Sequence, residues 1–153
     1  MRPILSAIDL PPVWLLAHLA LAWAISFIPL KLFGAAGVCF GSVLLGLGVT
    51  LMAAAIWAMS RARTTVIPRR DPAALVTSGV FGYSRNPIYL ADTMILTGAI
   101  LWWDAALALP LVAVFAWIIQ TRFIKDEEAR LTAGFGPEFD LWAQRVHRWF
   151  GRK

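Results

Sequence analysis

The sequence predicts an all-α membrane protein with four transmembrane helices, a C-terminal amphipathic helix at the membrane surface, and both termini in the cytoplasm. Of its 153 residues, 59% are hydrophobic and 15% charged, against roughly 45–50% and about 25% in soluble domains. The apolar residues form long runs, and the basic residues gather between and after them. This length suits one domain, so we expect residues 1–153 to form a single membrane domain.

Four apolar runs carry most of this hydrophobicity. We expect spans at about residues 13–30, 35–59, 88–103 and 105–124. A span needs about 20 residues, so the third run is short and should draw on polar residues at its cytoplasmic end. The first run has no small-residue cleavage site, which favours a retained helix over a signal peptide.

The basic residues give the orientation. Of the 14 Lys and Arg, five lie between residues 60 and 86 and six follow Ile124, whereas the other two connections carry one charged residue each. By the positive-inside rule, both termini and the central loop are cytoplasmic. In this membrane setting, the net charge of +5 indicates attraction to anionic lipid headgroups and not nucleic-acid binding.

The second span carries glycines at helical spacing. Gly37 and Gly41 lie four residues apart, a spacing that lets two helix backbones approach closely. We expect this face to pack within the chain, against the first or third span. A homodimer through the Gly37/Gly41 face is possible but less favoured. The single cysteine, Cys39, forms neither a disulfide framework nor a zinc cluster, and we expect no metal site.

The segment from Pro137 onward is amphipathic. Its large apolar residues recur at helical spacing: Phe139, Trp142, Val146 and Trp149. This pattern predicts a helix that lies in the membrane interface with its aromatic stripe in the acyl boundary. The polar segments 60–87 and 125–150 should therefore meet at the same membrane face.

The stretch RNPIYLAD opens the third span and is unusually polar for that position. Asn86 is a suitable N-cap and Pro87 suits the first helical position, while Tyr89 could belong to an aromatic belt. Asp92 has no such explanation, because an ionisable residue inside a span is costly unless it has a partner or a function. Asp92 therefore indicates a functional site.

The segments LVTSGVFGYSRNPIYLAD and EEARLTAGFGPEFDLWAQRVHRW, separated by a two-span hairpin, together resemble the isoprenylcysteine carboxyl methyltransferase and phospholipid methyltransferase superfamily. The resemblance covers roughly residues 75–150, the expected cofactor-binding half. The matching residues are Gly79, Arg85, Pro87, Tyr89, Glu127, Glu128, Leu131, Phe135 and Gly136. The motif's His is Asn86 here and its last Gly is Ala91. Asn cannot become cationic, so any role that needs imidazolium is in question.

The resemblance implies an integral membrane enzyme that uses S-adenosylmethionine and releases S-adenosylhomocysteine, with its active site at the cytoplasmic face. The acceptor would be lipophilic or amphipathic, and an isoprenylcysteine-type carboxylate is favoured because it is already ionised at neutral pH. A phospholipid amine and a small thiol are alternatives. A non-catalytic membrane scaffold or sensor is the alternative of another class.

The resemblance also implies the site. The catalytic candidates are Arg85, Asn86, Tyr89 and Asp92. The cofactor-binding candidates are Gly79, Gly82, Arg85, Asn86, Pro87, Tyr89, Glu127, Glu128 and Leu131. A cation would hold the methionyl carboxylate, and carboxylates would hold the ammonium or the ribose hydroxyls. Glu127 is the firmer match, and Glu128→Gln should matter less if Glu128 faces solvent.

Overall fold

The computed structural model describes residues 9–65 and 72–153. The basic residues Arg69 and Arg70, which contributed to the predicted orientation, lie outside the described residues. Within the described part, the chain is helical and has no strand, apart from one isolated β-bridge between Val146 and Arg152. The predicted all-α class is therefore confirmed for this part of the chain.

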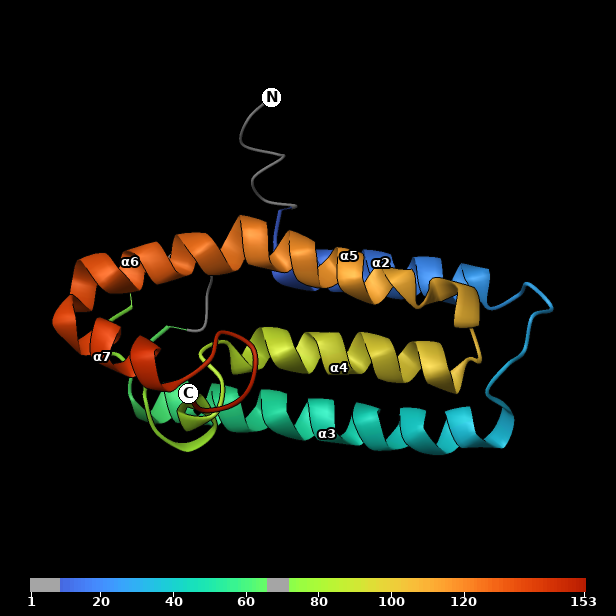
Figure 1. Ribbon diagram of the computed structural model, residues 1–153, viewed down its shortest axis with the longest axis horizontal. Coiled ribbons are helices and arrows are strands. Elements are labelled where there is room, and N and C mark those ends of the chain that lie inside the picture. The colour runs from blue at the N-terminus through green and yellow to red at the C-terminus, as the bar shows by residue number, and fades with distance from the viewer. Residues whose placement is uncertain (1–8, 66–71) are drawn as a thin grey trace, which may run out of the picture.

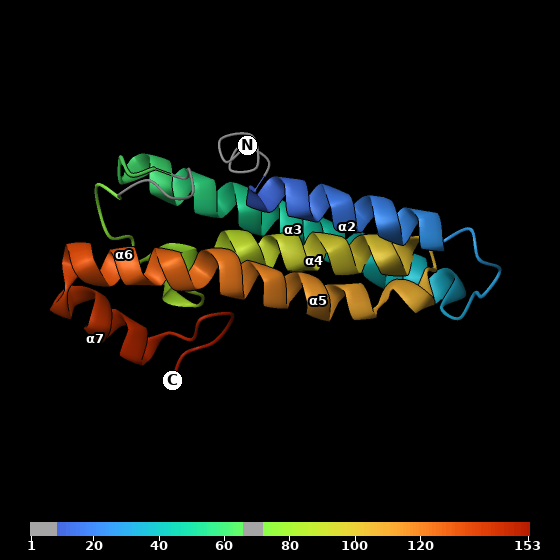
Figure 2. The same ribbon diagram turned by 90° about the horizontal axis from the view of Figure 1, so that it is seen from above.

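The helices run antiparallel along one elongated bundle (Figure 1). In chain order they are α2 (Pro11–Ile25), α3 (Gly34–Arg61), the 3-10 turn η1 (Gly79–Gly82), α4 (Pro87–Trp102), the 3-10 turn η2 (Ala106–Ala108), α5 (Pro110–Ile119), the π-helical turn η3 (Gln120–Ile124), α6 (Lys125–Phe135) and α7 (Pro137–Arg145). From α5 to α6 the backbone forms one continuous rod, after which α7 turns back beside it (Figures 1 and 2).

Within the described residues, two helices are long and apolar enough to cross a membrane, namely Gly34–Arg61 and the rod Ala106–Phe135. The shorter apolar helices α2 and α4 have 15 and 16 residues, or about 22–24 Å at 1.5 Å per residue. The predicted first span is too long, because α2 ends at Ile25. The chain leaves the helical path there, and Lys31 Nζ donates to Ser26 O at 2.7 Å.

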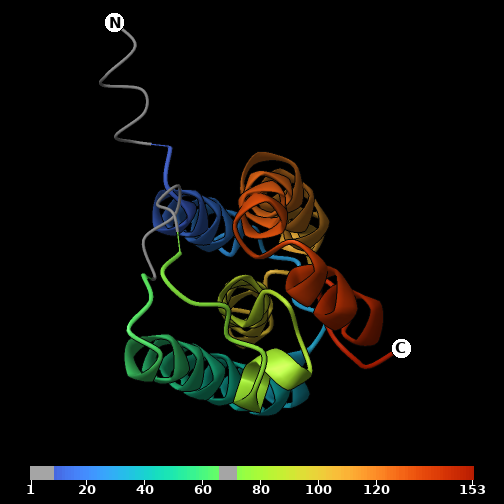
Figure 3. The ribbon, with the colours of Figure 1, turned by 90° about the vertical axis from the view of Figure 1, so that its left-hand side faces the viewer.

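α4 lies at the centre of the bundle and contacts α2, α3 and α5 (Figure 3). Its contact with α3 depends on glycine, because a Cβ on Gly41 would lie 2.6 Å from Gly98 O and a Cβ on Gly98 would lie 2.8 Å from Gly41 O. Added Cβ atoms on Gly37 and Gly48 would likewise meet α4. The packing of this glycine face against the third predicted span, within the chain, is confirmed.

The C-terminal amphipathic segment differs from its prediction. α7 ends at Arg145, and its apolar side is buried within the protein: Phe139 and Trp142 are 4% and 8% exposed. They pack with Ala55 of α3 and Phe81 of η1, and Trp142 Nε1 donates to Phe81 O at 3.1 Å. An aromatic stripe placed in the acyl boundary was wrong, because η1 and α3 supply its apolar partners.

The two ends of the bundle differ in the segments of the chain that gather there. One end gathers α6, α7, the C-terminal residues and the described part of segment 60–87 (Figures 1 and 2). The expectation that the two polar segments lie together is confirmed. The other end holds only the short connections between α2 and α3 and between α4 and α5. The candidate site residues therefore belong to the first end.

Candidate functional site

The site begins where η1 leads into α4. Pro87 occupies the first turn of α4, as predicted. Asn86 stands at the N-cap position, but its side chain makes no capping hydrogen bond, so the predicted cap was wrong. Its Nδ2 instead donates to the backbone carbonyl of Arg148 at 3.1 Å, while Arg85 N donates to His147 O at 3.1 Å. The C-terminal segment is thereby attached to the beginning of α4.

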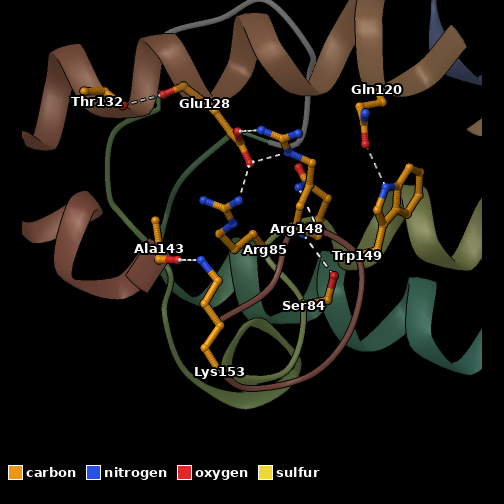
Figure 4. Close-up of polar contacts among 10 residues, drawn as sticks. Ser84, Arg85, Gln120, Glu128, Thr132, Ala143, Arg148, Trp149 and Lys153 are labelled. Carbon is orange, nitrogen blue, oxygen red and sulfur yellow. Dashed lines mark hydrogen bonds and ion pairs between the residues drawn. The ribbon is translucent and has the colours of Figure 1, made fainter. Parts of the chain in front are cut away.

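Glu128 of α6 connects these two segments through arginine side chains (Figure 4). Its Oε1 lies 3.2 Å from Arg85 Nη2 and accepts from Arg148 Nε at 3.1 Å, and its Oε2 accepts from Arg148 Nη2 at 2.6 Å. The side chains of Glu128, Arg85 and Arg148 are 14%, 13% and 31% exposed. Glu128 therefore does not face solvent, contrary to the expectation that made its substitution the milder one.

The two arginines experience different electrostatic environments in this cluster. Burial lowers the pKa of Arg85, an effect that Glu128 opposes and Arg148 reinforces. Donation to Glu128 raises the pKa of Arg148. Two cations share one carboxylate, and Arg85 Nε is buried without a hydrogen-bond partner in the part of the chain that the structure describes. The cluster thus retains excess positive charge and an unused donor.

Two acidic side chains, Glu127 of α6 and Asp92 of α4, lie near Tyr89 of α4. Tyr89 is 6% exposed, and its hydroxyl donates to Glu127 Oε2 at 3.1 Å. Asp92 follows on the same helix and is 4% exposed. Among the described residues its carboxylate has no hydrogen-bond or ion-pair partner. An unpaired carboxylate beside a cavity is available to a ligand.

Two neighbouring cavities meet at Glu127. The larger, of about 230 Å³, lies between α2, α3 and α4, and its lining includes Met52, Ile56, Asn86, Tyr89, Asp92 and Glu127. The smaller, of about 50 Å³, lies between α6 and the loop before η1, and its lining includes Leu131 and Arg130. Met59, Phe81 and Glu127 line both cavities. Glu127 therefore contacts an apolar helical space and a loop-lined space together.

Gly79 and Gly82 do not join this group. Gly79 begins η1 with φ +61°, and no atom lies within 4 Å of an added Cβ. Gly82 faces Arg152, whose Nη2 lies 3.6 Å from an added Cβ, and it lines a more open hollow beside α7. Their observed role is to shape the turn before α4.

Arg148 was missed as a site residue. It follows α7 in an irregular segment, and its bond to Glu128 spans 20 residues of sequence. The only sequence signal was the basic run RVHRW, which the amphipathic pattern had assigned to a surface helix. Trp149 from the same run donates from Nε1 to Gln120 Oε1 of η3 at 3.0 Å.

The described part of the chain thus combines apolar helices, two of them long enough to cross a membrane, with a cluster of polar and charged side chains at one end. Residues 36–138 match the family model described as phospholipid methyltransferase. The chain belongs to this family of membrane methyltransferases, within the superfamily that includes the isoprenylcysteine carboxyl methyltransferases. Neither a curated protein nor a solved structure matches the chain. The family match contains Asp92, Glu127 and Glu128 and ends before Arg148.

Proposed function

We propose that this membrane methyltransferase transfers a methyl group from S-adenosylmethionine to the amine of a lipid headgroup, in the cavity beside Asp92. The supporting observation is the buried carboxylate of Asp92, which has no partner among the described residues and lies in the lining of the larger cavity. The helical walls, which include Met52 and Ile56, suit an aliphatic chain. Asp92 and Glu127 suit a cationic headgroup.

The charges around this cavity favour an amine over a carboxylate acceptor. Among the described residues, its lining includes the acids Asp92 and Glu127 and no Lys or Arg. A carboxylate placed there would meet like charges in a poorly hydrated space, which is costly. An ammonium group would be attracted by the same residues. We therefore propose an amine acceptor in place of the isoprenylcysteine-type carboxylate that the sequence favours.

An amine must lose a proton before it can attack the methyl group. Asp92 is placed to take that proton from the ammonium, and Tyr89, which donates to Glu127, fixes the neighbouring carboxylate. The buried walls exclude water and orient the acceptor, and such alignment accounts for much of the rate advantage in displacement reactions. Bound S-adenosylmethionine supplies an activated methyl group on a cationic sulfur.

The residues present fit this cofactor. Glu127 lies between the cavities and can accept hydrogen bonds from an ammonium or ribose hydroxyls. Arg85 has a buried Nε–H without a partner and can donate to an anionic group. Leu131 offers apolar contact in the smaller cavity. Asn86, buried beside the larger cavity, supplies a polar edge where the family motif has His.

We also propose that α2, α3, α4 and the α5–α6 rod all cross the membrane, with the site end and both termini in the cytoplasm. The short helices α2 and α4 lie alongside longer ones, so their polar ends would lie at the membrane surface. Single cysteines at Ala62 and Lys153, introduced in a Cys39→Ser background, should react with impermeant reagents from the cytoplasmic side only. Labelling from opposite sides would contradict this topology.

The enzymatic test uses purified protein in lipid nanodiscs with methyl-labelled S-adenosylmethionine. One sample offers phosphatidylethanolamine, and the other offers a prenylated cysteine with a free carboxylate in an amine-free lipid. We expect label in the amine lipid, and a rate about 10²–10⁴-fold lower in Asp92→Asn, the range for loss of a general base. Asp126→Asn, an exposed change on α6, is the matched control.

Each other outcome identifies a different protein function. Label only in the prenylated cysteine would contradict the amine acceptor and support the carboxylate alternative. Label in a small thiol alone would support thiol methylation. No transfer to any acceptor, together with no saturable binding of S-adenosylhomocysteine, would support a non-catalytic scaffold or sensor.

A further inference from the structure

The cluster of Arg85, Arg148 and Glu128, called the arginine cluster below, carries more positive than negative charge. Its two guanidinium groups face one carboxylate at distances of 2.6–3.2 Å. The side chains of Arg85 and Glu128 are largely shielded from water, with exposures of 13% and 14%. A net positive charge in such a place is unfavourable unless an anion compensates it.

The cluster also retains hydrogen-bond donors. A guanidinium carries five N–H donors, and Glu128 takes two nitrogens of Arg148 and one of Arg85. Arg85 Nε is buried with no hydrogen-bond partner in residues 9–65 and 72–153. Arg148 is 31% exposed, so the cluster can be reached from outside on that side. The unused donors and the excess charge both suit one oxyanion.

Glu128 keeps the two arginines close together. Without it, Arg85 and Arg148 would repel each other. Arg148 belongs to a segment whose backbone forms hydrogen bonds with residues before α4. These contacts include Asn86 Nδ2 to Arg148 O at 3.1 Å and Gly151 N to Tyr83 O at 2.7 Å. Glu128 is therefore the internal counter-ion that organises the pair.

We propose that Arg85 and Arg148, held together by Glu128, form a binding site for a singly charged oxyanion of the ligand, with Arg148 as the member supplied by the C-terminal segment. The oxyanion site rests on the proposed function, which supplies two groups of this chemistry. They are the carboxylate of the cofactor's methionyl part and the phosphodiester of the acceptor lipid. The site gives residue 148, outside the family match, a direct role in binding.

The test measures equilibrium binding by calorimetry with the full-length protein in detergent, using two pairs of ligands. S-adenosylhomocysteine is compared with methylthioadenosine, which lacks the carboxylate. A short-chain phosphatidylethanolamine is compared with an alkylamine that lacks the phosphate. In Arg148→Gln, the oxyanion-bearing member of one pair should bind about 10- to 100-fold more weakly, as expected for a lost charge-assisted hydrogen bond. The other member should be unchanged.

The pair that shows the selective loss identifies the source of the oxyanion. Arg145→Gln removes an exposed arginine from the same C-terminal region and should leave all four affinities unchanged. Equal affinities for every ligand in Arg148→Gln and wild type, or equal losses within both pairs, would overturn the proposal. If Arg148→Gln does not fold, Arg148→Lys decides: it keeps the charge but not the two-pronged geometry, so a smaller selective loss is expected, and none would overturn the proposal.

The proposed function can fail separately. A wild-type protein that binds neither S-adenosylhomocysteine nor methylthioadenosine would contradict methyl transfer. A loss of phosphatidylethanolamine affinity in Arg148→Gln would still support the oxyanion site. Normal wild-type binding of S-adenosylhomocysteine that is insensitive to Arg148, together with insensitive lipid binding, would refute the oxyanion site and leave the proposed function standing.

Discussion

The two ends of the bundle each contain a carboxylate that joins segments distant in sequence, but they use it differently. At one end, Asp104 accepts three backbone N–H groups at 2.9–3.0 Å: those of Leu32, Phe33 and Gly34. These are donors at the beginning of α3, where a helix leaves N–H groups unsatisfied. At the other end, Glu128 joins Arg85 and Arg148. Both carboxylates hold the fold together.

The two ends differ in whether their charged and polar side chains are fully paired. Around Asp104, one acceptor group meets the donors of a helix end. Around Glu128, two cations share one anion, Arg85 Nε lacks a partner among the described residues, and Asp92 lies unpaired beside a cavity nearby. Unsatisfied buried polar groups cost stability. Among the described residues these groups gather at the Glu128 end, which is the end where we propose the ligand site.

The largest expected loss of stability follows Glu128→Gln. The substitution leaves two arginines close together without their counter-ion, and breaking a buried pair in this way costs about 3–5 kcal/mol. We expect about 3 kcal/mol, the low end, because Arg148 is partly exposed to water. The free energy of unfolding in detergent measures the effect. Glu138→Gln, an exposed change on α7, should have little effect; equal stability of both variants would contradict the role given to Glu128.

The next largest loss of stability is expected at the contact between α3 and α4. Gly41→Ala places a methyl group 2.6 Å from the Gly98 carbonyl oxygen, and backbone cannot easily shift, so we expect a loss of about 1–3 kcal/mol. Gly46→Ala, with nothing within 4 Å, should be neutral or slightly stabilising because alanine favours helix. Thermal unfolding of the two variants side by side gives the comparison. Similar behaviour would place the α3–α4 contact elsewhere.

Asp104→Asn tests the end of the bundle at which the Asp104 carboxylate accepts hydrogen bonds from the backbone at the beginning of α3. The Phe33 N–H, followed by those of Gly34 and Leu32 and by Lys31, holds the pKa of Asp104 below its usual value. Its stabilising contribution is therefore complete above the unfolded-state value of about 4 and is lost as the pH falls through the lower folded-state value. Asp104→Asn should be less stable than wild type at neutral pH, with the gap closing in acid. A constant gap across that range would contradict the charge-dependent cap.

The smallest effect on stability is expected at Asp92, although its effect on activity should be large. Asp92→Asn removes an unpaired buried carboxylate at nearly constant volume, so stability should stay the same or rise by up to about 1 kcal/mol, as for other active-site replacements. The melting temperature, measured on the sample used for the transfer assay, checks this. A marked loss of stability together with normal activity would make Asp92 a structural residue.

Much of the fold was predictable because hydrophobic runs and glycine spacing are local signals. The helical class, the polar end and the packing of the glycine face all followed from them. The end of the first helix did not, since it depends on Lys31 bonding to Ser26 and Trp103 across the loop. The interfacial aromatic stripe was wrong for a similar reason: its burial depends on Phe81, far away in sequence.

The site was predictable in its members on α4 and α6 but not in its partners. Asp92 could be identified because an ionisable residue inside an apolar run is unusual, whereas Tyr89 and Glu127 were candidates because of the family resemblance. Arg148 could not, because its pairing with Glu128 requires the chain to fold back after α7. The same fold-back redirects Asn86 from the helix end to the Arg148 carbonyl. Long-range polar pairs of this kind have no sequence periodicity.

Calorimetric titration of the purified wild-type protein with S-adenosylhomocysteine decides whether the Glu128 end binds the cofactor. We propose that the polar side chains at the Glu128 end bind the methyl donor and its product. We therefore expect saturable binding to one site per chain, with an affinity reduced by Glu127→Gln and unchanged by Asp104→Asn at neutral pH. Absence of saturable binding, or equal sensitivity to changes at both ends of the bundle, would contradict the account.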